Sequence, residues 1–297
     1  MTQGRKPDVL EQAQAKACCA DLYQSELARL ILGETLHPGG LALTNRLARL
    51  MGVQPGDWVV DLASGRGASA MAVSRVFRCN VVGVEFGRAA VAESQPATPQ
   101  GQTLETTPTP EAPGAYFVQG DAERPPLCTG FFDGLFSECS MSLFLDKPKA
   151  VAEAVGLLRP GGRFGLSDVT VATGSLPEEL DGAVGRILCL SDALDVDGYT
   201  RLLEGAGLRE IRQVDASTEI IKLLDSLGAK LGAFMAWQGL TGGAAPDSDL
   251  LRQAPELIAK LGRLVADGRL GYWLFAAEKP SSGPVDHRSS TPGFSSK

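Results

Sequence analysis

The chain has 297 residues and a formal net charge of −7, and its length predicts one large domain with appendages. The acidic balance and the lack of a basic cluster argue against a nucleic-acid or membrane partner, and no apolar run is long enough to span a membrane. Six cysteines without a C-x-x-C pair, after a start without an apolar leader, lead us to expect reduced thiols and a cytoplasmic protein. With two histidines in the sequence, we expect no resident metal.

Residues 1–52 are expected to form a helical cover over a core domain. Residues 9–32 are rich in helix-forming side chains, and residues 43–51 place apolar side chains at helical spacing. The loop 33–40 separates these two expected helices and contains the glycines that favour a turn.

From residue 53 onward, strand patterns alternate with helix patterns. This alternation predicts an α/β fold with a doubly wound, mainly parallel sheet. The expected strands are 58–62, 80–85, 115–118, 131–137, 163–167, 209–214 and 271–277, and the expected helices between them are 68–77, 149–158, 177–190 and 197–206.

Three segments interrupt or follow this core, which comprises residues 53–216 and 269–279. Residues 93–114 are rich in proline and threonine and are expected to form a flexible insertion. Residues 217–268 are expected to form a helical insertion before the last strand, on the side where an acceptor would bind. Residues 280–297 are serine-rich and are expected to be disordered.

A glycine-rich turn after the first core strand is the most informative motif. Asp61 ends the strand, and Gly65 and Gly67 follow at a tight turn that opens a helix. Glu85 ends the next strand, about 20 residues after the turn, as in nucleotide-type sites. A carboxylate at Asp61 would repel a pyrophosphate but could hold an ammonium group, which favours the amino-acid half of S-adenosylmethionine. The alternative is a strand, turn and helix without a ligand.

Two later motifs complete an ordered set: Gly-Asp-Ala-Glu at 120–123 and Leu-Arg-Pro-Gly-Gly at 158–162. With the glycine turn and Glu85 before them, they make residues 18–278 resemble the class I S-adenosylmethionine-dependent methyltransferases. The resemblance implies a Rossmann-like, seven-stranded, mostly parallel sheet and S-adenosylmethionine as the cofactor.

The resemblance also implies a set of cofactor contacts. Glu85 would accept hydrogen bonds from the ribose hydroxyls, Asp121 from the adenine amine, and Glu138 would face the methyl group. Two of these residues have alternatives, because Glu85 could be a solvated strand end and Asp121 could cap the next turn. The implied cofactor-binding residues of the core are Asp61, Ala63, Gly65, Gly67, Glu85, Phe86, Asp121, Ala122 and Glu138.

Three further segments are informative: residues 137–147 (Ser-Glu-Cys-Ser-Met-Ser-Leu-Phe-Leu-Asp-Lys), 164–169 and 176–180. They give the chain a closer resemblance to the arsenite methyltransferases and related ubiquinone-type small-molecule methyltransferases. It implies that thiolates of Cys189, Cys18 and Cys19 bind arsenic, since thiolates are soft donors. Each of these cysteines could instead be a small buried apolar residue. That is the reading we favour for Cys79, Cys128 and Cys139.

The loop sequence His37-Pro-Gly39-Gly40 is unusual between two helices. Adjacent glycines permit close approach of the backbone to a ligand. We therefore expect Gly39, Gly40 and Tyr23 of the helical cover to lie near the cofactor. His37 is a candidate imidazole base, with a capping role as the alternative.

These observations favour methyl transfer from S-adenosylmethionine to a small molecule by direct displacement. Arsenite or another thiol-bound metalloid is one candidate acceptor, with Glu138, Cys189 and His37 as candidate catalytic residues; Asp168 is a further candidate base. The alternatives are methylation of carbon, oxygen or nitrogen in a small organic metabolite, and a non-catalytic protein that binds S-adenosylmethionine. The acceptor and the oligomeric state stay open.

Overall fold

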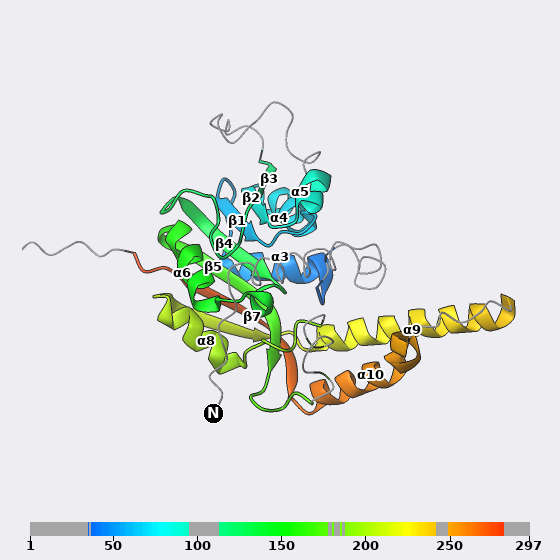
Figure 1. The fold of residues 1–297 in the computed structure, drawn as a ribbon. Helices are drawn as coiled ribbons and strands as arrows, with labels where there is room; N and C mark the ends of the chain where they lie inside the picture. Colours follow the sequence, from blue (N-terminus) through cyan, green and yellow to red (C-terminus); the bar gives the residue numbers. More distant parts are fainter. Residues whose placement is uncertain are drawn as a thin grey trace, which may run out of the picture.

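The computed structural model describes residues 35, 37–94, 113–177, 180, 185, 188–241 and 249–281 (Figure 1). Within these ranges the chain forms one seven-stranded sheet with helices on both faces. The predicted doubly wound, mostly parallel α/β fold is therefore confirmed. The expected sites Cys18, Cys19 and Tyr23, the tail from 282, and most of the proposed flexible insertion lie outside the described residues.

The sheet has the strand order β3-β2-β1-β4-β5-β7-β6. All its neighbours are parallel except β7, which runs antiparallel to β5 and to β6. The strands are β1 (Trp58–Leu62), β2 (Asn80–Glu85), β3 (Ala115–Gln119), β4 (Phe132–Glu138), β5 (Leu158–Val171), β6 (Arg209–Asp215) and β7 (Leu270–Glu278).

Sequence patterns located the strands well, and β1 and β2 have the predicted bounds. The largest difference is at β5, which extends beyond the predicted 163–167 at both ends. Its first residue, Leu158, pairs with Phe132 of β4, and its last, Val171, pairs with β7. Pairing with neighbouring strands sets these ends, and a local pattern cannot show such partners.

The described helices are α3 (Gly40–Met51), α4 (Ala68–Phe77), α5 (Arg88–Ser94), α6 (Lys147–Leu157), α8 (Val196–Gly205), α9 (Thr218–Thr241) and α10 (Asp249–Ala266), with the 3-10 turn η2 (Met141–Leu143). The short helix α5 was not predicted and includes the first two residues of the proposed insertion at 93–114. Its Ala90 and Val91 are buried, and the Ser94 hydroxyl donates to the Ala90 carbonyl. Most of the expected helix at 177–190 lies outside the described residues.

Two hydrophobic clusters fill the two faces of the sheet. Because side chains alternate along a strand, Val59 of β1 joins the cluster under α3 and α4, whereas Val60 joins the cluster under α6 and α8. The same alternation along β4 sends Phe136 to the α3 face and Leu135 to the α6 face. Odd and even positions of each central strand therefore face different helices.

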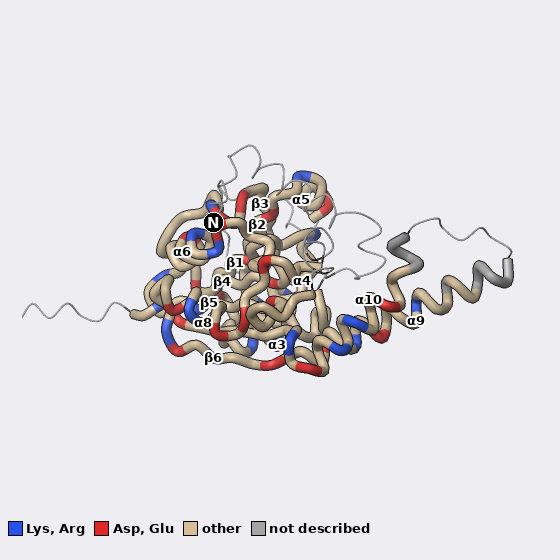
Figure 2. The backbone as a smooth tube through the Cα atoms, turned by 60° about the horizontal axis from the view of Figure 1, so that its bottom comes forward, with Lys and Arg blue, Asp and Glu red and all other residues tan. Residues whose placement is uncertain are grey.

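The helices α9 and α10 form the predicted helical insertion between β6 and β7 and extend away from the body of the molecule (Figures 1 and 2). Ile220 and Leu264 anchor the base of this pair in the cluster on the α3 face. Figure 2 shows acidic and basic residues interspersed over the described backbone. Of the helices in the described ranges, none has the length and apolar character that crossing a bilayer requires.

The fold predicts a specific cost for a side chain at Gly67. A Cβ there would come within 2.3 Å of Phe117 Cζ, and the backbone has φ +81°. Gly67→Ala should lower the free energy of unfolding by about 2–4 kcal/mol in urea titrations. Gly56→Ala is the matched control, because Gly56 has φ +87° but no described atom within 4 Å of the added Cβ, and it should cost about 1–2 kcal/mol.

A double mutant identifies the source of the larger cost. Phe117→Leu should recover part of the Gly67→Ala loss and none of the Gly56→Ala loss. Equal losses for the two glycine variants would contradict the packing explanation.

Candidate active site

Three carboxylates lie at the carboxyl ends of adjacent parallel strands. Asp61 is the second-last residue of β1, and Glu85 and Glu138 are the last residues of β2 and β4. All three lie at strand positions that alternate onto the α3 and α4 face, as Val59 and Phe136 do. The strand order reverses at β1, between β2 and β4, and ligands of such sheets bind outside the strand ends at this point.

Of the three carboxylates, Asp61 is the one whose burial is least compensated by hydrogen bonds. Its residue is 2% exposed, and its Oδ2 has no hydrogen-bond partner among the described residues. Burial raises the pKa of Asp61 well above its usual range, and the nearby charges of Glu138 and Glu85 raise it further, while a hydrogen bond from the Ala70 N–H lowers it. A cationic group beside Oδ2 would satisfy this oxygen and restore the charged form.

The two glycines of the turn after β1 have different roles. Gly65 has φ +54°, and a Cβ there would meet no described atom within 4 Å, so its backbone borders open space. Gly67 is required because the ring of Phe117 fills the place of a side chain. Ala63 has φ +61°, a left-handed conformation that is uncommon for a residue with a Cβ. Gly65 is therefore the position where the backbone can approach a ligand.

Glu85 is turned toward this glycine turn. Its carboxylate accepts hydrogen bonds from the N–H groups of Gly65 at 2.9 Å and Gly87 at 2.7 Å. Burial raises the pKa of Glu85, and these N–H groups lower it. The buried, hydrogen-bonded carboxylate is not the solvated strand end that the sequence left open.

The predicted adenine-side residues are described as follows. Asp121 Oδ1 accepts from the Glu123 N–H at 2.9 Å, which is the turn-capping contact that the sequence offered as the alternative. Ala122 is buried in the cluster on the α6 face. Phe86 is half-buried, and its carbonyl accepts from the Gln119 side-chain amide at 3.3 Å.

Glu138 is the centre of a buried polar network. Its Oε2 accepts from the hydroxyls of Thr44 on α3 at 2.9 Å and Ser69 on α4 at 2.7 Å. Its Oε1 accepts from Ser167 on β5 at 3.4 Å. Sequence analysis missed these three hydroxyl residues, although Ser69 lies in the first turn of the helix that the glycines open.

His37 closes the network from the loop before α3. Its Nε2 lies 3.4 Å from Glu138 Oε2, and its Nδ1 lies 3.0 Å from the Pro38 carbonyl oxygen. Both ring nitrogens thus face oxygens of the protein, so His37 ties its loop to Glu138 and does not present a free nitrogen to an acceptor. Gly39, also in this loop, lies against Leu43 and Glu219, the latter at the start of α9.

Two cysteines come together beside this network. Cys139 directly follows Glu138, and the thiol of Cys189, which is 5% exposed, donates to the Cys139 carbonyl oxygen at 4.0 Å. The neighbouring Cys189 thiol, followed by burial, raises the pKa of Cys139 well above its usual range. Both cysteines have left-handed backbones, with φ +49° and +60°. The expected arsenic ligand Cys189 thus lies beside Cys139, a cysteine to which the sequence analysis assigns a structural role.

The remaining predicted residues have structural surroundings. Cys79 is buried as expected, whereas Cys128 is exposed, so its expected burial was wrong. Asp168 is fully buried and accepts from the N–H groups of Ser142 at 3.0 Å and Val169 at 2.7 Å. Burial raises the pKa of Asp168 to about 6. Asp168 therefore fastens the η2 turn after Glu138 and Cys139.

Known proteins match this architecture. A family model described as a methyltransferase domain matches residues 60–166. An arsenite methyltransferase of Halobacterium salinarum is 29% identical over 180 residues, which cover 58% of this chain and 43% of that protein. The 27-O-demethylrifamycin SV methyltransferase of Amycolatopsis mediterranei is 24% identical, with 83% and 86% covered. The fold is similar to that of Haemonchus contortus phosphoethanolamine N-methyltransferase 2 bound to S-adenosyl-L-methionine (TM-score 0.68, 17% identity, 89% and 57% covered).

A methyltransferase domain thus occupies residues 60–166, and these similarities support a class I S-adenosylmethionine-dependent methyltransferase. The chain spans about half the length of the arsenite methyltransferase and of the phosphoethanolamine enzyme that it matches. Members of this family are enzymes, and their methyl donor is S-adenosylmethionine.

The residues of this site fit S-adenosylmethionine. S-adenosylmethionine carries two positive groups, a sulfonium and an ammonium, and the buried carboxylates of Asp61, Glu85 and Glu138 face the same edge of the sheet. The unpartnered Oδ2 of Asp61 suits the ammonium group, and the open backbone at Gly65 leaves room beside it. When bound, the cofactor supplies a methyl group that its sulfonium makes electrophilic.

Asp61 should make the ligand-free protein less stable. A carboxyl group with a raised folded-state pKa holds its proton more tightly than the unfolded chain does, so stability falls as the pH rises from the ordinary value of 3.8 toward the raised value. Asp61→Asn removes this loss. The ligand-free variant should melt about 3–6 °C higher than the wild type at pH 8, and this gain should shrink as the pH falls.

Asp195→Asn is the control for thermal melting, because hydrogen bonds from the Thr173 hydroxyl and the Gly198 N–H hold the pKa of Asp195 below its usual range. It should not melt higher than the wild type. A lower melting temperature for Asp61→Asn at pH 8 would show that the protein compensates this carboxylate by itself.

Proposed function

We propose that this methyltransferase transfers the methyl group of S-adenosylmethionine to a small-molecule acceptor. The observation that carries the proposal is the buried Asp61 carboxylate with an oxygen that no described group satisfies, beside the open backbone of Gly65. Burial of an unpaired charge is unfavourable unless a ligand compensates it. The family's cofactor has the complementary charge.

For the acceptor, we propose a trivalent metalloid such as arsenite, held by Cys139 and Cys189. A neutral metalloid hydroxide can condense with two protonated thiols, forming two sulfur–metalloid bonds as two water molecules leave. This chemistry suits protonated thiols, and the Cys189 thiol and burial raise the pKa of Cys139 well above its usual range. A metal cation would instead have to displace the thiol protons.

The surroundings of Glu138 support an acceptor that needs no general base. Its oxygens accept from Thr44, Ser69 and Ser167, and both nitrogens of His37 face protein oxygens. A metalloid lone pair can attack the methyl group without losing a proton, whereas a hydroxyl acceptor requires a base. Proteins with similar sequences include an O-methyltransferase of Pyrenophora dematioidea as well as the arsenite methyltransferase, so an organic acceptor is the alternative.

We further propose that the α9–α10 insertion shapes the acceptor side, as expected from the sequence. The first turn of α9 lies beside the loop before α3, where a Cβ at Gly39 would approach Glu219 Cγ to 3.2 Å. The base of the insertion and the His37 loop therefore lie together next to the Glu138 network.

The proposal is tested by measuring S-adenosylhomocysteine formation with arsenite and glutathione. The wild type should turn over, and Cys139→Ser and Cys189→Ser should each lose at least about tenfold in rate while binding S-adenosylmethionine with unchanged affinity in calorimetry. Cys128→Ser, at an exposed thiol, is the control and should retain full activity.

Three results distinguish the candidate functions. Cofactor binding without arsenite-dependent turnover would overturn the metalloid acceptor and favour an organic one. Turnover that survives both cysteine substitutions would overturn the role of the thiol pair. Undetectable binding of S-adenosylmethionine would overturn the proposed function as a whole.

A further inference from the structure

The two oxygens of Glu138 have unequal partners. Oε2 accepts from the hydroxyls of Thr44 at 2.9 Å and Ser69 at 2.7 Å, and His37 Nε2 lies 3.4 Å from the same oxygen. Among the described residues, Oε1 accepts one long hydrogen bond, from Ser167 at 3.4 Å. Because the side chain of Glu138 is 5% exposed, solvent offers Oε1 little compensation. The protein therefore holds one oxygen of this buried carboxylate and leaves the other with capacity for a cationic group.

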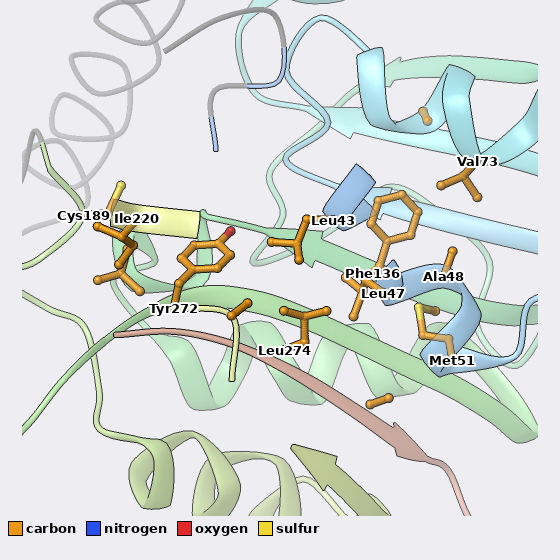
Figure 3. Close-up of a cluster of buried hydrophobic side chains, with 14 of the residues drawn as sticks. Leu43, Leu47, Ala48, Met51, Val73, Phe136, Cys189, Ile220, Tyr272 and Leu274 are labelled. Carbon is orange, nitrogen blue, oxygen red and sulfur yellow. The ribbon is translucent and has the colours of Figure 1, made fainter. Parts of the chain in front are cut away.

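Thr44 and Ser69 come from two helices that pack on the same face of the sheet. Leu43, next to Thr44 on α3, belongs to the same buried hydrophobic cluster as Phe136 of β4 (Figure 3). Ser69 lies in the first turn of α4, and its hydroxyl lies 3.2 Å from that of Thr44. Both hydroxyls are buried, so they reach Oε2 from neighbouring positions in a packed region. Together they fix the orientation of the Glu138 carboxylate.

The free capacity of Oε1 lies near the unmet charge of Asp61. Pairing of β1 with β4 places Asp61 opposite Phe136, two residues before Glu138 and thus about 7 Å away along the strands. The charge of Glu138 raises the pKa of Asp61, whose Oδ2 has no described partner. Two buried carboxylates at this spacing suit a ligand with two cationic groups. In S-adenosylmethionine a short aliphatic chain joins the sulfonium to the carbon that carries the ammonium group.

We propose that Thr44 and Ser69 are positioning residues that hold Glu138 with Oε1 toward the sulfonium of S-adenosylmethionine, so that the site distinguishes the charged methyl donor from its neutral product. In methyl transfer, the lone pair of the acceptor forms the new bond to the methyl carbon, and the electron pair of the broken carbon–sulfur bond stays on sulfur. The sulfur of S-adenosylhomocysteine is therefore neutral, and the attraction to Glu138 is lost once the product has formed. The inference rests on the proposed function for the identity of the ligand.

In this role Glu138 is a fixed charge and not a general base. Hydroxyls of Thr44, Ser69 and Ser167 donate to its oxygens, and such donors favour the charged form of a carboxylate. This environment suits an electrostatic role in a step that removes no proton. The inference therefore agrees with an acceptor that needs no base.

Calorimetric titrations with S-adenosylmethionine and S-adenosylhomocysteine test the inference without an acceptor. Glu138→Gln should weaken binding of S-adenosylmethionine by at least about tenfold and binding of S-adenosylhomocysteine by less than about twofold. Thr44→Val and Ser69→Ala should each weaken binding of S-adenosylmethionine about three- to tenfold more than binding of S-adenosylhomocysteine. A purely structural role of the two hydroxyls would weaken binding of both ligands alike.

Ser74→Ala is the matched control, because Ser74 is a buried serine of the same helix α4 whose hydroxyl donates to the Cys79 carbonyl at 2.9 Å. It should leave the ratio of the two affinities unchanged. An unchanged ratio in Glu138→Gln, or in both Thr44→Val and Ser69→Ala, would overturn the proposal, and the two hydroxyl variants decide if Glu138→Gln does not fold. Undetectable binding of both ligands to the wild type would instead overturn the proposed function itself.

Discussion

The alternation of side chains along parallel strands brings three carboxylates to one face at one edge of the sheet. A carboxylate without compensation is costly to bury, and the protein compensates the three unequally. Glu85 accepts two backbone N–H groups, and Glu138 accepts several hydroxyls and faces His37. Asp61 keeps an oxygen without a described partner. This inequality makes the end of β1 the place where a cationic ligand contributes most to stability.

In the proposed function, this edge of the sheet separates a donor half from an acceptor half. Gly65 and Asp61 lie in the proposed donor half, where the backbone is open and one Asp61 oxygen has no described partner. Glu138 lies at the border, because α3 and α4 bind one of its oxygens and β5 binds the other. The proposed acceptor half begins at the next residue, Cys139, and Asp168 fastens its turn by accepting from the Ser142 N–H. Glu138 therefore lies between the two proposed halves.

The sequence predicted those features that depend on local pattern. The bounds of β1 and β2 follow from their β-branched residues, and the spacing from Asp61 to Glu85 identified the type of cofactor before any contact was known. Features that depend on distant partners were missed. The ring of Phe117, fifty residues later in the chain, explains why residue 67 is a glycine. The proposed role of Cys139 depends on its neighbour Cys189, and no local motif connects the two.

The most direct test of the account compares two ligands that differ in the amino-acid group. S-adenosylhomocysteine carries the ammonium group that Asp61 is proposed to bind, whereas 5′-methylthioadenosine lacks it. In calorimetric titrations at pH 8, Asp61→Asn should weaken binding of S-adenosylhomocysteine by at least about tenfold and leave binding of 5′-methylthioadenosine unchanged. Equal weakening of both ligands, or no weakening of either, would contradict the assignment of Asp61 to the ammonium group.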